Sequence, residues 1–249
     1  MDFLANTNLN NSVILKLNNI RKSFDGLNVL DDVSFDLSSG TITSLFGENG
    51  SGKTTLFHII SGFLKAESGD ILFNNKSIIG QGALEIAKQG IGRIWQNPRI
   101  FKNLSVIDNL ILPVPNHPGE NVVNYLLHPK TIFATERVLK ERAVAIADDI
   151  NLAGKLGKTA GSLSLGQQKL LSTGMLLMSD ASMLLIDEPF AGVNSQMVDH
   201  ISEVFINLKT SGKTICVIEH NRVKAEAISD RTITIIKGRI SEDRSTGGR

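Results

Sequence analysis

The sequence predicts an α/β fold with a mostly parallel β-sheet core, a small antiparallel β-subdomain and an inserted α-helical subdomain. Two unbroken apolar runs, residues 183–186 and 214–218, are typical of central parallel strands that are buried on both faces. Alternating apolar residues at 13–24 and 33–37 instead predict half-buried antiparallel strands. Because strands alternate with helical segments along the rest of the chain, we expect ligands at the carboxyl ends of the parallel strands.

The composition excludes several classes of protein. With 249 residues, of which 41% are hydrophobic and 20% charged, the chain is long enough to bury a substantial core and is not of a disordered type. Lys and Arg number 26 against 25 Asp and Glu, and no long basic run stands out, so we expect no nucleic-acid partner. The single cysteine, Cys216, is predicted to be a small buried hydrophobe, which excludes a disulfide within one chain.

The sequence predicts no membrane-spanning segment. No apolar run approaches the length that crosses a bilayer, and the Asn-rich residues 1–12 lack the apolar core of a secretory signal. We therefore expect any association with a membrane to be indirect, through a partner.

The N-terminal part of the chain predicts the antiparallel β-subdomain. Residues 13–24 and 33–37 are separated by a turn around Asp25 and Gly26, and residues 69–73 form a further short strand. We expect these strands to lie beside the phosphate-binding loop described next and to hold the base of its nucleotide.

Residues 47–54 match the pattern of a phosphate-binding loop, G-x-x-x-x-G-K-[ST], at every fixed position. They follow a predicted strand, residues 41–46, and precede a predicted helix that ends near Gly62. Glycine lets backbone N–H groups approach a polyphosphate closely, Lys53 supplies a cation to the β- and γ-phosphates, and Thr54 offers a hydroxyl to Mg²⁺. A Gly-rich turn that matches by chance is the alternative. The nucleotide contacts predicted here are Gly47, Glu48, Asn49, Gly50, Ser51, Gly52, Lys53, Thr54 and Thr55.

The middle of the chain predicts an inserted helical subdomain. Five of the six prolines lie between residues 98 and 129, together with a polar stretch around Asn116 and Glu120. Because proline fixes φ and removes a backbone donor, a regular core sheet cannot run through this segment. Residues 135–150 then predict an amphipathic helix. We expect one domain over residues 1–249, with the core and β-subdomain at 1–96 and 166–249 and the helical insertion at 97–165.

Charged residues follow both buried strands of the predicted parallel sheet. Asp187 and Glu188 end the first strand, and His220 comes directly after the second. In a parallel sheet these strand ends lie at the same edge as Lys53. Asp187 is placed to hold the Mg²⁺ shell and Glu188 to polarise water for attack on a γ-phosphorus. The alternative is a pair of solvated loop carboxylates.

The phosphate-binding loop and the charged strand ends, in their order along the chain, resemble the ATP-binding cassette of ABC transporters, and the resemblance extends from about Leu15 to Ile240. The amino-acid sequence is most similar to the ATPase subunits of bacterial branched-chain amino acid importers in residues 93–101, 163–168 and 218–220. The resemblance implies a P-loop NTPase core of the RecA-like type, with ATP and Mg²⁺ as cofactors.

Three further side chains take roles from the resemblance. Phe24 resembles the aromatic residue that stacks on adenine, the alternative being an ordinary strand aromatic. Gln96 resembles the glutamine that joins the two subdomains and contacts Mg²⁺ and the attacking water, the alternative being a surface glutamine. His220 resembles the histidine that contacts the γ-phosphate. The other histidines are expected to be structural or surface residues: His58, His117, His128 and His200.

Residues 163–167 lie where the family has its signature, usually Leu-Ser-Gly-Gly-Gln, with Leu165 as a departure at the third position. Ser164 is a natural helix N-cap and Gly166 permits close approach, so the segment with Gln167 can present N–H groups to a γ-phosphate. The resemblance implies that the signature of one copy completes the site of a second ATPase subunit. A plain capped helix is the alternative. Asn194 stands where the family often has the aspartate of the segment that crosses between the two sites.

The resemblance implies Mg-dependent ATP hydrolysis by a dimer that drives solute transport through partner transmembrane permease subunits, with branched-chain amino acid uptake as the expected case. It places the chain on the cytoplasmic face of the membrane as a peripheral protein. Two alternatives are a soluble ABC ATPase of translation or DNA maintenance and a non-hydrolysing nucleotide-sensing module. Intact Lys53, Asp187, Glu188 and His220 argue against the sensing module, because a degenerate site is expected to lose at least one of them.

Overall fold

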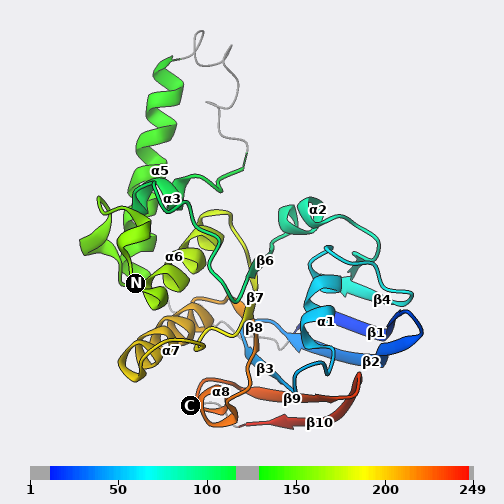
Figure 1. The fold of residues 1–249 in the computed structure, drawn as a ribbon. Coiled ribbons are helices and arrows are strands. Elements are labelled where there is room, and N and C mark those ends of the chain that lie inside the picture. The colour runs from blue at the N-terminus through cyan, green and yellow to red at the C-terminus, as the bar shows by residue number, and fades with distance from the viewer. Residues whose placement is uncertain (1–11, 116–128, 247–249) are drawn as a thin grey trace, which may run out of the picture. The chain divides into compact units, whose positions relative to one another are not determined.

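The computed structural model describes residues 12–115 and 129–246, and their strands and helices form two compact units (Figure 1). One unit consists of residues up to 86 together with those from 208 onward, and the other of residues 87–207. The polar stretch predicted around Asn116 and Glu120 lies outside the described residues. No helix in the described part of the chain is long and apolar enough to cross a bilayer.

The first unit contains the predicted antiparallel sheet. Its strands β1 (Val13–Phe24), β2 (Leu27–Ser38), β4 (Ser68–Phe73) and β5 (Lys76–Ser77) run in the order β2-β1-β4-β5. Asp25 and Gly26 have φ of 48° and 82°, so the hairpin between β1 and β2 is a two-residue turn with both central residues left-handed. All pairings between the strands of this sheet are antiparallel, which confirms the predicted antiparallel β-subdomain.

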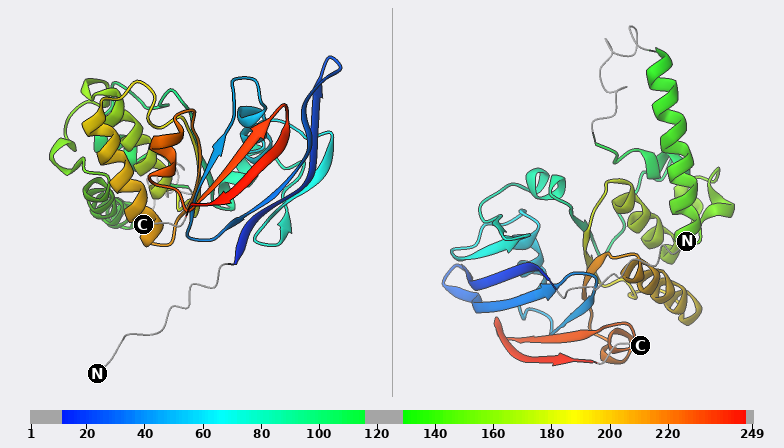
Figure 2. Two further views of the ribbon diagram at one scale, coloured as in Figure 1. Left: turned by 90° about the horizontal axis from the view of Figure 1, so that it is seen from below. Right: turned by 180° about the vertical axis from the view of Figure 1, so that it is seen from behind.

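The same unit contains the parallel strands that position the phosphate-binding loop. Strand β3 (Ile42–Phe46) pairs in parallel with β8 (Thr214–Ile218) on one side and β9 (Arg231–Ile236) on the other. Every residue of β3 and β8 is buried, and the unbroken apolar run of β8 predicts its burial. Strand β10 (Arg239–Ser245) forms an antiparallel hairpin with β9, and this hairpin runs beside β2 in both views of Figure 2.

Helices in this unit follow the parallel strands. Helix α1 (Lys53–Ile60) comes directly after the loop that ends β3, and α8 (Arg222–Glu226) comes shortly after β8. Cys216 is buried within β8, as predicted, and burial raises the pKa of its thiol to about 12.

The second unit pairs two parallel strands, β6 (Ile91–Ile94) and β7 (Met183–Asp187), and packs three helices on one another. The helices are α3 (Val106–Ile111), α5 (Pro129–Asp149) and α6 (Leu165–Met178). Gly174 of α6 makes their close packing possible, because a Cβ there would lie 2.6 Å from Ile150 Cδ1 and 2.7 Å from Leu110 Cδ2. Short 3₁₀ turns at Ala153–Lys155 and Ala160–Ser162 lead into α6.

Two further helices cross the boundary between the units along the chain, α2 (Ala83–Lys88) and α7 (Ser195–Thr210). Helix α7 was not predicted from the sequence, although Ile201, Val204, Phe205 and Leu208 are buried at helical spacing. The start of α5 was predicted at residue 135, six positions after Pro129, where the helix begins. Proline suits the first helical position because its missing N–H has no partner there in any case.

Candidate nucleotide site

The loop between β3 and α1 turns sharply at its glycines. Gly47, Gly50 and Gly52 have φ of 155°, 78° and 106°, a region that side chains disfavour. A Cβ at Gly47 would collide with the carbonyl oxygen of Ile235 and with Ser51 Oγ, and one at Gly52 would lie 2.6 Å from Val29 O. A Cβ at Gly50 would meet nothing within 4 Å. All three glycines were predicted from the sequence to let the backbone approach a polyphosphate. The structure shows that Gly47 and Gly52 are also required by packing within the chain.

Lys53, the first residue of α1, lies inside this loop. Its side chain is only 4% exposed, and its ammonium donates to the carbonyl oxygens of Gly47 and Glu48, both at 2.8 Å, and to Ser51 Oγ at 3.4 Å. A buried cation needs such compensation. The loop therefore holds a positive charge at its centre.

The start of α1 suits an anion. Its N-cap, Gly52, has no side chain to cap the helix, and the first turn of α1 contains no acidic residue. The backbone N–H groups of that turn and the helix dipole therefore favour negative charge at this point. Thr54 is exposed in the same turn. A Gly-rich loop, a buried cation and an uncapped helix start fit a polyphosphate.

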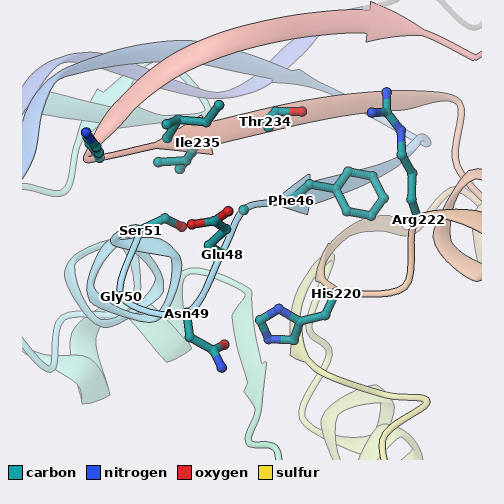
Figure 3. A pocket seen from close by; sticks show the side chains of 12 residues that line it. Phe46, Glu48, Asn49, Gly50, Ser51, His220, Arg222, Thr234 and Ile235 are labelled. Atoms are coloured by element: carbon teal, nitrogen blue, oxygen red, sulfur yellow. The ribbon is translucent and has the colours of Figure 1, made fainter.

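A hollow of about 700 Å³ borders the loop (Figure 3). His220, exposed directly after β8, faces this hollow from the side opposite β9. Arg222 lies on its rim, where it pairs with Glu226 and Glu242. Glu48 and Asn49 of the loop complete the near wall. The first unit thus brings His220 and the phosphate-binding loop to one cavity, as expected from the strand ends.

Phe24 lies at the end of β1 with 45% of its surface exposed. Lys22 Nζ lies 5.1 Å from its ring centroid, which is a cation–π distance. Its role against adenine stays a prediction. Of the remaining histidines, His58 lies in α1 and His200 in α7, and His117 and His128 lie outside the described residues.

Asp187, the last residue of β7, is buried beside a cation that the sequence analysis did not identify. Arg93 of the neighbouring strand β6 places Nη2 at 3.7 Å from Asp187 Oδ2. Burial lowers the pKa of Arg93 to about 10, and the attraction of Asp187 offsets only part of this shift. The guanidinium also stacks at 4.0 Å from the ring of Trp95. The sequence offered no signal for this contact, because strand β6 was not predicted.

Glu188 and Gln96 meet in the second unit. Gln96 Nε2 donates to Glu188 Oε2 at 2.6 Å, across 92 positions of the sequence. Glu188 has a φ of 48°, a left-handed conformation that costs a non-glycine residue roughly 1–2 kcal/mol. Strain of this kind is common at functional sites and requires support from neighbouring groups.

The signature segment begins α6 with a complete capping box. Ser164 Oγ accepts from the N–H of Gln167, and Gln167 Oε1 accepts from the N–H of Ser164. Leu165, the departure from the usual signature, is 40% exposed. Gly166 is required by packing within the chain, because a Cβ there would collide with Met197 Cγ and lie 2.7 Å from Val193 Cγ1. Gly166 was predicted to serve approach to a nucleotide, and the structure adds this second reason for a glycine.

Known proteins are similar to this chain in sequence. Residues 30–191 match the family described as ABC transporter. A relative from Methanocaldococcus jannaschii, named as a probable branched-chain amino acid transport ATP-binding protein LivG, is 39% identical over 83% of this chain and 80% of its own length. The high-affinity branched-chain amino acid transport ATP-binding protein BraF of Pseudomonas aeruginosa is 30% identical over 90% of this chain and 89% of its own.

Solved structures share the fold. A nucleotide-free ATP-binding cassette from an ABC transporter has a TM-score of 0.81 and 34% identity over 96% of this chain and 92% of its own. An ATP-binding cassette in its ADP conformation has a TM-score of 0.83 and 35% identity, and covers 95% of this chain and 92% of its own.

Proposed function

The chain belongs to the ABC transporter family and is an ATPase of that family, and from this premise we propose that it powers branched-chain amino acid uptake. The observation that carries the ATPase assignment is the phosphate-binding loop, in which the ammonium of Lys53 lies at the centre of a Gly-rich turn before an uncapped helix. The names of the relatives support the class of solute. Neither alternative, a soluble ABC ATPase or a nucleotide sensor, has comparable support.

We assign the phosphate contacts to residues 47–55, with Lys53 as the main cation. The ammonium would exchange the carbonyls of Gly47 and Glu48 for phosphate oxygens, which are stronger acceptors. His220, at the rim of the hollow beside the loop, would hydrogen-bond the γ-phosphate. Phe24, exposed at the end of β1, would stack on the base.

We assign Mg²⁺ to oxygen ligands from Thr54, Gln96 and Asp187. A carboxylate, an amide oxygen and a hydroxyl are the ligand types that this cation accepts, so the side chains fit it. When bound, Mg²⁺ neutralises charge that develops on the transferred phosphoryl group. Asp187 already lies beside one cation, since Arg93 Nη2 is 3.7 Å from its Oδ2.

Glu188 is our candidate for the general base. Its carboxylate would accept a proton from the attacking water, and Gln96 would orient it through the hydrogen bond at 2.6 Å. These are the roles that the family resemblance implies for the two residues.

We also propose two kinds of partner. A second ATPase subunit would have its nucleotide site completed by the signature residues Ser164, Gly166 and Gln167, because their capped helix start can face a γ-phosphate. Transmembrane permease subunits would hold the chain at the cytoplasmic face of the membrane. Residues 97–165, the predicted helical insertion, are our candidate for coupling the two.

Uptake of labelled leucine tests this function. Cells that lack the gene should lose leucine uptake, and the wild-type chain should restore it while Glu188→Gln should not. Uptake of labelled glucose in the same cells is the control and should not change. Undiminished leucine uptake in the deletion strain would remove the proposed solute class, whereas restoration by Glu188→Gln would remove the proposed base.

A further inference from the structure

Lys169, in the second turn of α6, reaches the backbone of the loop that follows β7. Its side chain is 5% exposed, and its Nζ lies 2.7 Å from Glu188 O, 2.9 Å from Ala191 O and 3.1 Å from Pro189 O. Only a protonated amine carries three N–H groups, and three carbonyls accept them. The ammonium therefore gathers the carbonyl oxygens of one short loop at a single point.

This loop has a backbone that needs support. Glu188 is left-handed at a φ of 48°, and Gly192 at 71° ends the segment. Carbonyl oxygens that converge on one point repel one another unless a cation lies between them. Phe190 anchors the loop from a different direction by packing its ring against Phe205, with centroids 6.5 Å apart.

We propose that Lys169 is a positioning residue for Glu188: its ammonium fixes the left-handed backbone of Glu188 and thereby the direction of the carboxylate that Gln96 contacts. The inference rests on the proposed role of Glu188 as the base. Lys169 contacts the backbone carbonyl of Glu188, whereas Gln96 contacts its carboxylate.

The same helix carries the signature at its start. Leu165 Cδ2 lies 3.0 Å from where a Cβ of Gly192 would be, and Gly166 packs against Val193 and Met197. Helix α6 thus contacts the loop after β7 through its first turn and again through Lys169. The same 14-residue helix therefore joins the signature to the backbone carbonyl of Glu188.

The test compares variants of the full chain with its partners present. Lys169→Met removes the N–H donors and keeps the aliphatic stem, and Lys169→Arg keeps the charge. Thr173→Val is the matched control, because Thr173 is buried one turn further along α6 and its hydroxyl donates to the carbonyl oxygen of Lys169 at 3.2 Å. Steady-state kcat, KM and the Kd for a fluorescent ATP analogue are measured for each.

We expect Lys169→Met to lower kcat by about 10-fold to 100-fold, the effect of displacing a catalytic group by about 1 Å. The Kd for the ATP analogue should stay within about twofold of wild type, Lys169→Arg should recover part of kcat, and Thr173→Val should retain it. In the Glu188→Gln background, Lys169→Met should have little further effect, because the two residues act through one carboxylate.

Two results would overturn the inference alone: an unchanged kcat in Lys169→Met while Glu188→Gln is inactive, or an equal loss in Thr173→Val. Full hydrolysis by Glu188→Gln would instead overturn the proposed base, and the inference with it. If Lys169→Met does not fold, Lys169→Gln decides, because its shorter and neutral side chain cannot supply an ammonium to the three carbonyls; a wild-type kcat in that variant overturns the inference.

Discussion

Replacing Gly166 with alanine separates the two reasons for a glycine in the signature. The backbone there is ordinary helix, so the substitution introduces no φ strain, and any destabilisation comes from the added methyl group. That methyl would collide with Met197 Cγ and lie 2.7 Å from Val193 Cγ1. Overpacking of this kind costs about 1–3 kcal/mol, and the better helix propensity of alanine returns up to about 1 kcal/mol.

The net loss is therefore about 1 kcal/mol, or about 2–4 °C in melting temperature for a chain of this size. A second change, Met197→Ala, removes the shorter of the two contacts and leaves the one with Val193, so Gly166→Ala should cost less stability in the Met197→Ala background than in the wild-type chain. ATP hydrolysis by the double variant should nevertheless remain low, because the methyl still separates the signature from the phosphate of a second subunit. Urea denaturation and phosphate release measure the two properties. The reasoning would be refuted by a Gly166→Ala chain as stable as wild type, and the signature role by a double variant that hydrolyses ATP normally.

Three further predictions use other parts of the chain. Lys53→Ala should abolish ATP hydrolysis and weaken ATP binding in a fluorescence titration, since the loop loses the buried ammonium that lies at its centre; normal turnover would remove the phosphate-binding role of the loop. Phe101→Ala should reduce copurification with the permease without changing ATP binding, because the ring is 52% exposed while Asn109 holds its backbone N–H and C=O; a melting temperature lowered along with copurification would assign the ring to the core instead. The free energy of unfolding should fall by up to about 1.4 kcal/mol per pH unit above pH 9, because the unfolded thiol of Cys216 then loses its proton and the folded thiol keeps it to about pH 12; a Cys216→Ala chain with the same slope would contradict this.

The sequence predicted those parts of the fold that depend on local pattern. Strand β8 begins and ends where its apolar run does, and the phosphate-binding loop was found because its residues are consecutive. Strand β6 was missed because Gly92 and Arg93 interrupt its apolar pattern, and its pairing partner β7 lies about 90 positions later. Pairing of this kind adds stability that no single segment displays.

The candidate site divides in the same way. Residue types at strand ends suggested Asp187, Glu188 and His220, since carboxylates and imidazoles after buried strands are seldom placed for packing alone. The contacts among these residues were beyond the sequence. Arg93 beside Asp187, Gln96 on the carboxylate of Glu188 and Lys169 on its carbonyl all join segments that lie far apart in the chain.

The central claim is that this chain is a transport ATPase in which Glu188 acts as the base on water at a bound ATP. The most direct measurement is the rate of phosphate release by Glu188→Gln together with its Kd for ATP and its elution volume in Mg-ATP. An amide retains the shape and the hydrogen bond to Gln96 but accepts no proton, so kcat should fall by about 10²-fold to 10⁴-fold while the Kd stays near wild type. Because the variant cannot hydrolyse bound ATP, its dimer should last longer than that of the wild type, and it should elute as a dimer in Mg-ATP. Phosphate release at the wild-type rate would contradict the account.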